Sequence, residues 1–147
     1  MKDRIRKKLP DIVRSIIINA DINKVWDAIS TKGGLEAWLM PNDFKAIMGY
    51  KFTFQSQPKR GWDGVVYCEV KELNPPKCLG FTWEGNNMEQ YVSFDLKEVG
   101  RNTEFTLTHA GWSEEHMELR EIMYDGWGYL SEGLKKRMDE ENGRYLS

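Results

Sequence analysis

The clearest hydrophobic pattern lies near the end of the chain, from Ser113 to about Asn142. Apolar side chains recur there at steps of three or four residues, which places them on one face of an α-helix. They are Leu119, Met123, Trp127, Leu130, Leu134 and Met138. Ser113 can cap the start of this helix, and Asn142-Gly143 can end it. About 30 residues make a helix of roughly 45 Å, whereas a compact chain of this length has a radius of gyration of about 15 Å, so the helix must cross the whole domain.

The N-terminal part of the chain predicts one strand and two short helices. Residues 12–18 are rich in β-branched side chains, which favour a strand. Asp21 can cap a helix that holds apolar residues up to Ile29, and Gly33-Gly34 breaks it. A second helical piece follows over residues 35–39, before Pro41.

From Phe44 to Ala110 the hydrophobic period changes from 3.6 to 2, which is typical of strands with one wet face. The alternation predicts strands near 50–54, 62–73, 79–83, 92–96 and 105–109. Turns are expected at 58–61, 74–76, 86–87 and 100–102, and such short connections make neighbouring strands antiparallel. The 62–73 strand is expected to be the longest. Its parity is ambiguous, with Val66, Cys68 and Val70 favoured as the inward set.

This order of elements predicts an α+β domain. A curved antiparallel sheet of about six to seven strands wraps around the long C-terminal helix, with two short helices after the first strand. A chain of 147 residues with 40% hydrophobic residues is expected to form one domain over residues 1–147. Residues 1–9 carry five basic side chains and are expected to form a flexible basic tail.

Charge and composition exclude several classes of partner. The net charge of −2 gives no overall attraction to nucleic acid or to an anionic membrane. No apolar run approaches the roughly 18 residues of a membrane span, and the start lacks the apolar segment of a signal peptide. Cys68 and Cys78 are therefore interpreted as reduced thiols of a cytoplasmic protein, expected to be a monomer or a weak dimer.

Several short segments, in order along the chain, resemble one family. Residues 20–29 read Ala-x-x-x-x-Val-Trp-x-Ala-Ile, and Phe81-Thr82-Trp83, the segment 103–112 and Gly126-Trp127 follow. Together they resemble the START-like (SRPBCC) superfamily, and most of all its branch named after the activator of the heat-shock-protein-90 ATPase. The resemblance implies a helix-grip fold with a cavity between sheet and helix, and a link to the stress response. It also implies three functions between which fold cannot choose: hydrophobic ligand binding, co-chaperone-like protein binding, and cofactor-free cyclase or aromatase activity.

The first interpretation is a binding site for a small hydrophobic, aromatic or polycyclic molecule. Its walls are expected from Trp38, Phe52, Phe54, Phe81, Trp83, Trp112, Met123, Trp127 and Leu130. The alternative is that these side chains simply fill the core. Gly126 and Gly133 lie inside the predicted helix, where each costs about 1 kcal/mol relative to alanine, so they either leave space or allow close packing.

His109 shares the inward parity of its strand and is the candidate polar contact to the ligand. It could also act as a general base, or tie the strand end to the turn at 111–113. The sequence contains no G-x-S-x-G, H-E-x-x-H or phosphate-binding glycine loop. We therefore predict no catalytic residue, metal or cofactor and favour a binding protein over an enzyme. In the co-chaperone alternative, Trp62 near a hairpin tip is the exposed aromatic candidate for protein contact.

Overall fold

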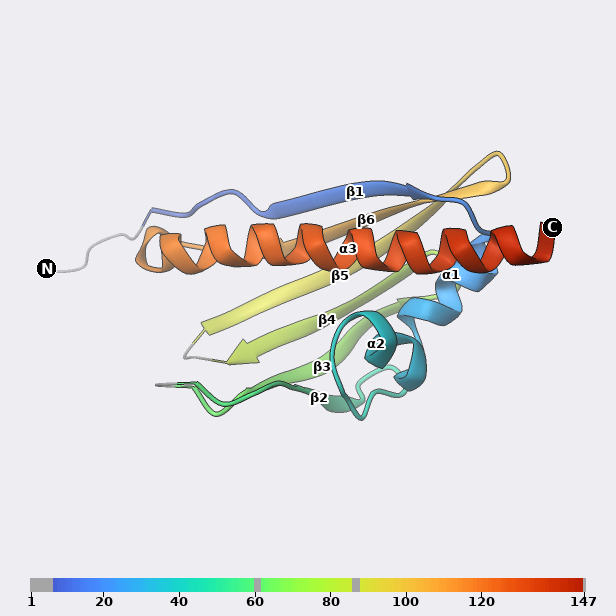
Figure 1. The fold of residues 1–147 in the computed structure, drawn as a ribbon. Helices are drawn as coiled ribbons and strands as arrows, with labels where there is room; N and C mark the ends of the chain where they lie inside the picture. Colours follow the sequence, from blue (N-terminus) through green and yellow to red (C-terminus); the bar gives the residue numbers. More distant parts are fainter. Residues whose placement is uncertain (1–6, 60–61, 86–87, 147) are drawn as a thin grey trace, which may run out of the picture.

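The computed structural model describes the backbone of residues 7–59, 62–85 and 88–146, and side chains as far as residue 140. These residues form a six-stranded antiparallel sheet in the order β1-β6-β5-β4-β3-β2, and the long helix α3 lies along it from one end to the other (Figure 1). The elements are β1 (Ile12–Ile18), α1 (Ile22–Ile29), α2 (Lys32–Trp38), β2 (Lys51–Gln55), β3 (Val65–Asn74), β4 (Cys78–Gly85), β5 (Met88–Val99), β6 (Asn102–Ala110), the 3₁₀ turn η1 (Glu114–His116) and α3 (Met117–Leu146). The predicted α+β helix-grip architecture is confirmed.

Alternation along the strands determines which side chains face α3. The inward parity predicted for β3 is confirmed, because Val66, Cys68 and Val70 are all buried. Buried side chains stand opposite one another across neighbouring strands, as in the Phe81–Val92 and Phe94–Leu107 pairs. Such pairs stabilise a sheet because they bury apolar area on one face. The predicted longest strand is wrong: β5 has 12 residues, whereas β3 begins only at Val65 and has 10.

The two short helices begin at capping side chains. Asp21 accepts a hydrogen bond from the Asn23 N–H at 3.0 Å, as predicted. Gly33 and Gly34 do not break a helix, because the Thr31 hydroxyl caps α2 by accepting from the Gly34 N–H at 3.0 Å. A Cβ at Gly34 would lie 2.6 Å from the Ala28 carbonyl oxygen, so glycine here permits close approach of the two helices.

The predicted bounds of α3 are wrong at both ends. A 3₁₀ turn separates Ser113 from the first α-helical residue, and the Ser113 side chain makes no capping hydrogen bond. The helix continues past Asn142-Gly143 to Leu146, since an internal glycine costs only about 1 kcal/mol and does not forbid a helix. Burial along the helix is unequal: Leu134 and Met138 are buried, whereas residues 119 and 123 are only partly covered.

The chain start packs against the turn before α3. The Leu9 N–H donates to the Trp112 carbonyl oxygen, and the Glu114 N–H donates to the Lys7 carbonyl oxygen, both at 3.0 Å. Residues 7–9 of the predicted basic tail are thus hydrogen-bonded to this turn, while residues 1–6 lie outside the described residues. The predicted turns at 58–61 and 86–87 fall partly or wholly outside them as well. Within the described residues, no helix is long and apolar enough to cross a membrane.

Candidate functional site

Aromatic rings fill the middle of the space between sheet and helix. The Trp127 ring lies 5.5 Å from the Trp83 ring and 6.4 Å from the Phe94 ring, measured between centroids. Phe81 lies 5.9 Å from Phe54 and contacts Phe94 at 5.6 Å. Of these five side chains, Trp83 is 6% exposed and the other four are essentially inaccessible to solvent. Phe54, Phe81 and Trp127, which the sequence suggested as ligand walls, therefore lie in the solid core.

A pocket of about 310 Å³ lies instead at the end of the grip where α3 begins. Figure 1 shows that the start of α3, the end of β4 and the start of β5 lie at the same end of the domain. We call this hollow the Trp83 pocket. Its lining residues are Met40, Lys59, Trp62, Val66, Trp83, Gly85, Met88, Gln90, Trp112, Leu119, Ile122 and Met123.

Three of the ten candidate residues from the sequence meet in this pocket: Trp83, Trp112 and Met123. The residues that sequence reasoning missed include Met40, Met88 and Gln90. The sequence contained a usable signal for Gln90, because this residue occupies the same alternating positions as the buried residues of β5. Gln90 is itself buried. A polar side chain among inward apolar positions indicates a hydrogen-bonded role inside the domain.

The polar centre beside the pocket is a chain of hydrogen bonds through His109. The Trp127 indole N–H donates to His109 Nδ1 at 2.9 Å, and His109 Nε2 lies 2.7 Å from Gln90 Oε1. Gln90 Nε2 donates to the Gly111 carbonyl oxygen at 3.3 Å. The Trp112 indole N–H donates to the His109 carbonyl oxygen at 3.1 Å. The histidine thus ties the end of β6 to the following turn.

Donor and acceptor roles in this chain are settled by Trp127. An indole N–H only donates, so His109 Nδ1 must accept, and a neutral imidazole then carries its proton on Nε2. Burial lowers the pKa of His109 to about 3, which keeps the ring neutral near pH 7. Both ring nitrogens are engaged inside the protein, so His109 offers a ligand no free nitrogen, and its lowered pKa does not suit a general base at neutral pH.

The Trp83 indole N–H differs from its neighbours. The N–H groups of Trp62, Trp112 and Trp127 donate to protein acceptors. Among the described residues, the Trp83 N–H has no acceptor, although the side chain is only 6% exposed and lines the pocket. Trp83 Nε1 is not among the fully buried side-chain atoms that lack a partner, so this N–H is an unused donor that remains accessible to solvent or to a ligand.

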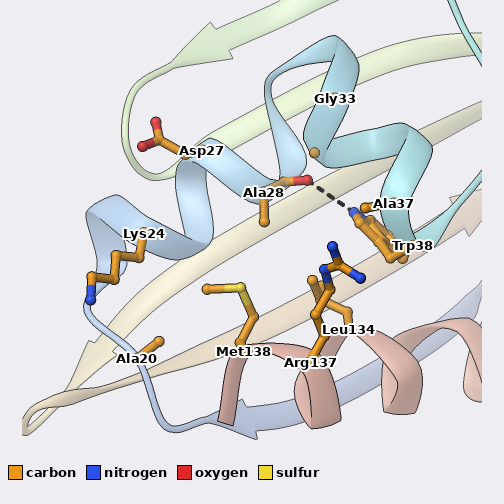
Figure 2. A pocket seen from close by; sticks show the side chains of 11 residues that line it. Ala20, Lys24, Asp27, Ala28, Gly33, Ala37, Trp38, Leu134, Arg137 and Met138 are labelled. Carbon is orange, nitrogen blue, oxygen red and sulfur yellow. Dashed lines mark hydrogen bonds between the residues drawn. The ribbon is translucent and has the colours of Figure 1, made fainter. Parts of the chain in front are cut away.

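A second hollow of about 370 Å³ lies between the short helices and the C-terminal half of α3. Figure 2 shows Leu134 and Met138 of α3 facing Ala28 and Trp38, whose indole N–H donates to the Ala28 carbonyl oxygen at 3.0 Å. The lining of this hollow carries both positive and negative charges, from Lys24, Asp27 and Arg137. Mixed charge and a satisfied tryptophan make it a weaker candidate for an apolar ligand.

The remaining sequence candidates lie in two other surface grooves. Leu130 and Gly133 line a groove between α2 and α3, and Phe52 borders one on the opposite face of the sheet. A Cβ at Gly126 or Gly133 would meet nothing within 4 Å, so both glycines leave space rather than allow close packing. At Gly128, in contrast, a Cβ would meet the Arg14 guanidinium.

The thiols and acids of the described residues form no recognisable reactive centre. Both cysteines are free, and burial raises the pKa of the Cys68 thiol far above its usual range and that of Cys78 to about 12. Protonated thiols are poor nucleophiles and poor metal ligands. No group of three or more His, Cys, Asp or Glu side chains with metal-binding geometry occurs within these residues.

Solved structures of other proteins share this fold. A Bacillus halodurans protein of known structure is 36% identical, with 90% of this chain and 99% of that chain covered at a TM-score of 0.79. A Mesorhizobium loti protein is 26% identical over 88% of this chain and 97% of its own, at a TM-score of 0.82. The Colwellia psychrerythraea Aha1 dimer shares the fold, at 24% identity, 89% and 97% coverage and a TM-score of 0.78. No curated protein sequence matches the chain.

The family model described as "Activator of Hsp90 ATPase homolog 1-like protein" matches residues 19–139, which is most of the chain. That span begins directly after β1 and contains both short helices, strands β2 to β6 and α3 as far as Asp139. The chain belongs to the activator of Hsp90 ATPase homolog 1-like family, within the START-like superfamily.

Proposed function

We propose that this protein binds a small hydrophobic, aromatic molecule in the Trp83 pocket. One observation carries the proposal: an apolar hollow of about 310 Å³ has an unpartnered indole N–H in its wall. Ligand sites are typically apolar clefts with a few polar groups that orient the ligand. The pocket lies near the lower end of the usual size range, about 300–1,000 Å³, which favours a compact ring system over a long acyl chain.

The side chains of the pocket suit a flat ring. Trp62, Trp83 and Trp112 provide aromatic surfaces, against which another ring can stack or stand edge-on. Met40, Met88 and Met123 line the same hollow, and flexible thioethers adapt to ligands of different outline. Ile122 is 66% exposed and lies at the rim, where a bound ligand would cover it.

A titration with naphthalene-type compounds tests this proposal. Binding should change the tryptophan fluorescence and raise the melting temperature, because a ligand at 100 times its Kd stabilises the folded state by about 2.7 kcal/mol. Ile122→Glu should weaken binding, since it places a charge at the apolar rim. Tyr129→Glu is the matched control on the same helix: Tyr129 is 82% exposed and outside the pocket lining. Equal binding by both variants, or no binding by the wild type, would contradict the proposal.

A second candidate is a protein-binding module of the co-chaperone kind. The observation in its favour is that Met117 and Ile122 are exposed apolar side chains on the first turns of α3, beside the pocket. The ATPase rate of a purified Hsp90-type chaperone, measured with and without this protein, separates the two functions. Stimulation that Ile122→Glu abolishes would favour the second candidate.

A cofactor-free cyclase or aromatase activity is the third candidate function. Because His109 is neutral and internally bonded, we propose that a bound ligand leaves the pocket unchanged. Mass spectrometry of ligand recovered after long incubation tests this point, and conversion of the ligand would replace binding with catalysis.

A further inference from the structure

We infer that the Trp83 pocket selects its ligand by a negatively charged acceptor oxygen, so that the preferred class is an aromatic carboxylate. This inference rests on the proposed binding function and adds the polarity of the ligand to it. Three observations carry it: the orientation of the Gln90 amide, the unpartnered Trp83 N–H and the charge of the lining.

The hydrogen-bond chain determines which end of the Gln90 amide is available. Trp127 can only donate, so His109 Nδ1 accepts and His109 Nε2 donates to Gln90 Oε1. The amide oxygen is thereby held toward His109, and Nε2 takes the other side. That nitrogen carries two hydrogens, of which the bond to the Gly111 carbonyl oxygen uses one. The remaining N–H makes Gln90, a lining residue, a donor.

Trp83 adds a second donor of the same polarity. Its indole N–H has no acceptor among the described residues, and an indole nitrogen cannot accept. The polar side-chain groups of the inner wall therefore donate, and a ligand that offers only donors leaves them unpaired. An unpaired buried polar group is unfavourable by roughly 1–3 kcal/mol, a factor of about 5 to 150 in affinity.

The charge of the lining favours an anion. Of the described residues around the pocket, Lys59 alone is charged, and no Asp or Glu side chain is among them. Hydrogen bonds from N–H groups to an ionised oxygen are roughly twice as strong as those to a neutral one. A carboxylate can accept from both inner donors, and the lysine at the rim adds electrostatic attraction.

Three probes with the same ring system and different polar groups test the inference: 2-naphthoate, its methyl ester and 2-naphthylmethylammonium. Calorimetric titration at pH 7 should find the carboxylate tightest, the ester roughly tenfold weaker, and the ammonium weakest. Equal affinity for all three would overturn the selection by polarity while leaving the proposed binding function intact. Failure of all three to bind would overturn both.

Two substitutions separate the inner donor from the rim charge. Trp83→Phe keeps a ring but removes the N–H, and should lower carboxylate affinity roughly 10- to 150-fold and ester affinity much less. Lys59→Met should lower carboxylate affinity about two- to fivefold and leave the ester unchanged. Lys59 is an exposed position, so this variant tests the inference even where Trp83→Phe folds poorly.

A matched control distinguishes loss of this donor from loss of any tryptophan. Trp62 also lines the pocket, but its indole N–H already donates to the Val65 carbonyl oxygen at 3.1 Å. Trp62→Phe should therefore change the affinities of carboxylate and ester by the same factor. An unchanged carboxylate-to-ester ratio in Trp83→Phe, or a lowered one in Trp62→Phe, would overturn the assignment of Trp83 as the selective donor.

Discussion

The middle of the grip and the Trp83 pocket are built from the same kinds of side chain but differ in packing. In the middle, Trp127 of α3 packs onto Trp83 and Phe94, and the Trp127 and Phe94 rings are almost completely inaccessible to solvent. At the start of α3, the helix follows a 3₁₀ turn, and Leu119 and Met123 are only partly covered. Aromatic residues on an inward face of the sheet therefore indicate burial. How closely α3 packs against the sheet decides whether they also line a cavity.

The largest expected effect is a difference in stability between these regions. Trp127→Ala removes a fully buried ring and the donor to His109, and should lower the free energy of unfolding by about 3–5 kcal/mol. Ile122→Ala at the pocket rim should change it by less than about 0.5 kcal/mol, because that side chain is largely exposed. Urea unfolding of both variants measures the contrast. Similar losses would mean that the two regions are not packed differently.

A smaller effect is expected at the boundary between the regions. Gln90→Leu leaves the His109 Nε2–H without its acceptor and should cost about 1–3 kcal/mol. The same urea experiment measures it. If the variant is as stable as the wild type, the buried hydrogen-bond chain does not hold His109 in place.

The pH dependence of stability tests the environment of His109. Its pKa is about 3 in the folded protein, whereas an unfolded histidine has a pKa near 6.5. Between these values the unfolded state binds the additional proton, so stability is full above about pH 6.5 and falls as the pH decreases toward 3. The slope contributed by this residue is up to about 1.4 kcal/mol per pH unit. His109→Gln should show a shallower decline between pH 6.5 and 5 in parallel unfolding experiments; an identical decline would contradict the buried neutral histidine.

The smallest expected effect concerns the glycines of α3. Gly133→Ala should raise the free energy of unfolding by up to about 1 kcal/mol, because alanine favours the helix and a Cβ there meets nothing. Gly128→Ala should gain less, since the Arg14 guanidinium must move aside. Thermal unfolding compares the two. A larger gain in stability for Gly128→Ala than for Gly133→Ala would contradict the open space at Gly133 and the Arg14 contact at Gly128.

Most of the fold followed from local patterns in the sequence. The inward parity of β3 and the Asp21 cap depend on neighbouring residues, and both were predicted. The end of α3 was not, because Gly143 only lowers helix propensity and does not stop a helix.

The position of the pocket depends on distant parts of the chain. Trp83 and Phe81 occupy equivalent positions on one strand face, yet Trp83 lines the pocket whereas Phe81 is completely buried. Met40 follows α2, and Met88 opens β5, so nothing in their sequence spacing brings them together. The tertiary packing at the start of α3 determines where the pocket lies. The hydrophobic periodicity of the sequence carries no information about that packing.

The indole N–H signals in a proton–nitrogen correlation spectrum test the central claim most directly. The chain has six tryptophans, and the Trp83 signal is identified by its loss in Trp83→Phe. On titration with 2-naphthoate, that signal should move to lower field as its N–H gains an acceptor, while the Trp127 signal changes little because its bond to His109 persists. A Trp83 signal that stays in place while Trp38, in the other hollow, responds would contradict a ligand site in the Trp83 pocket.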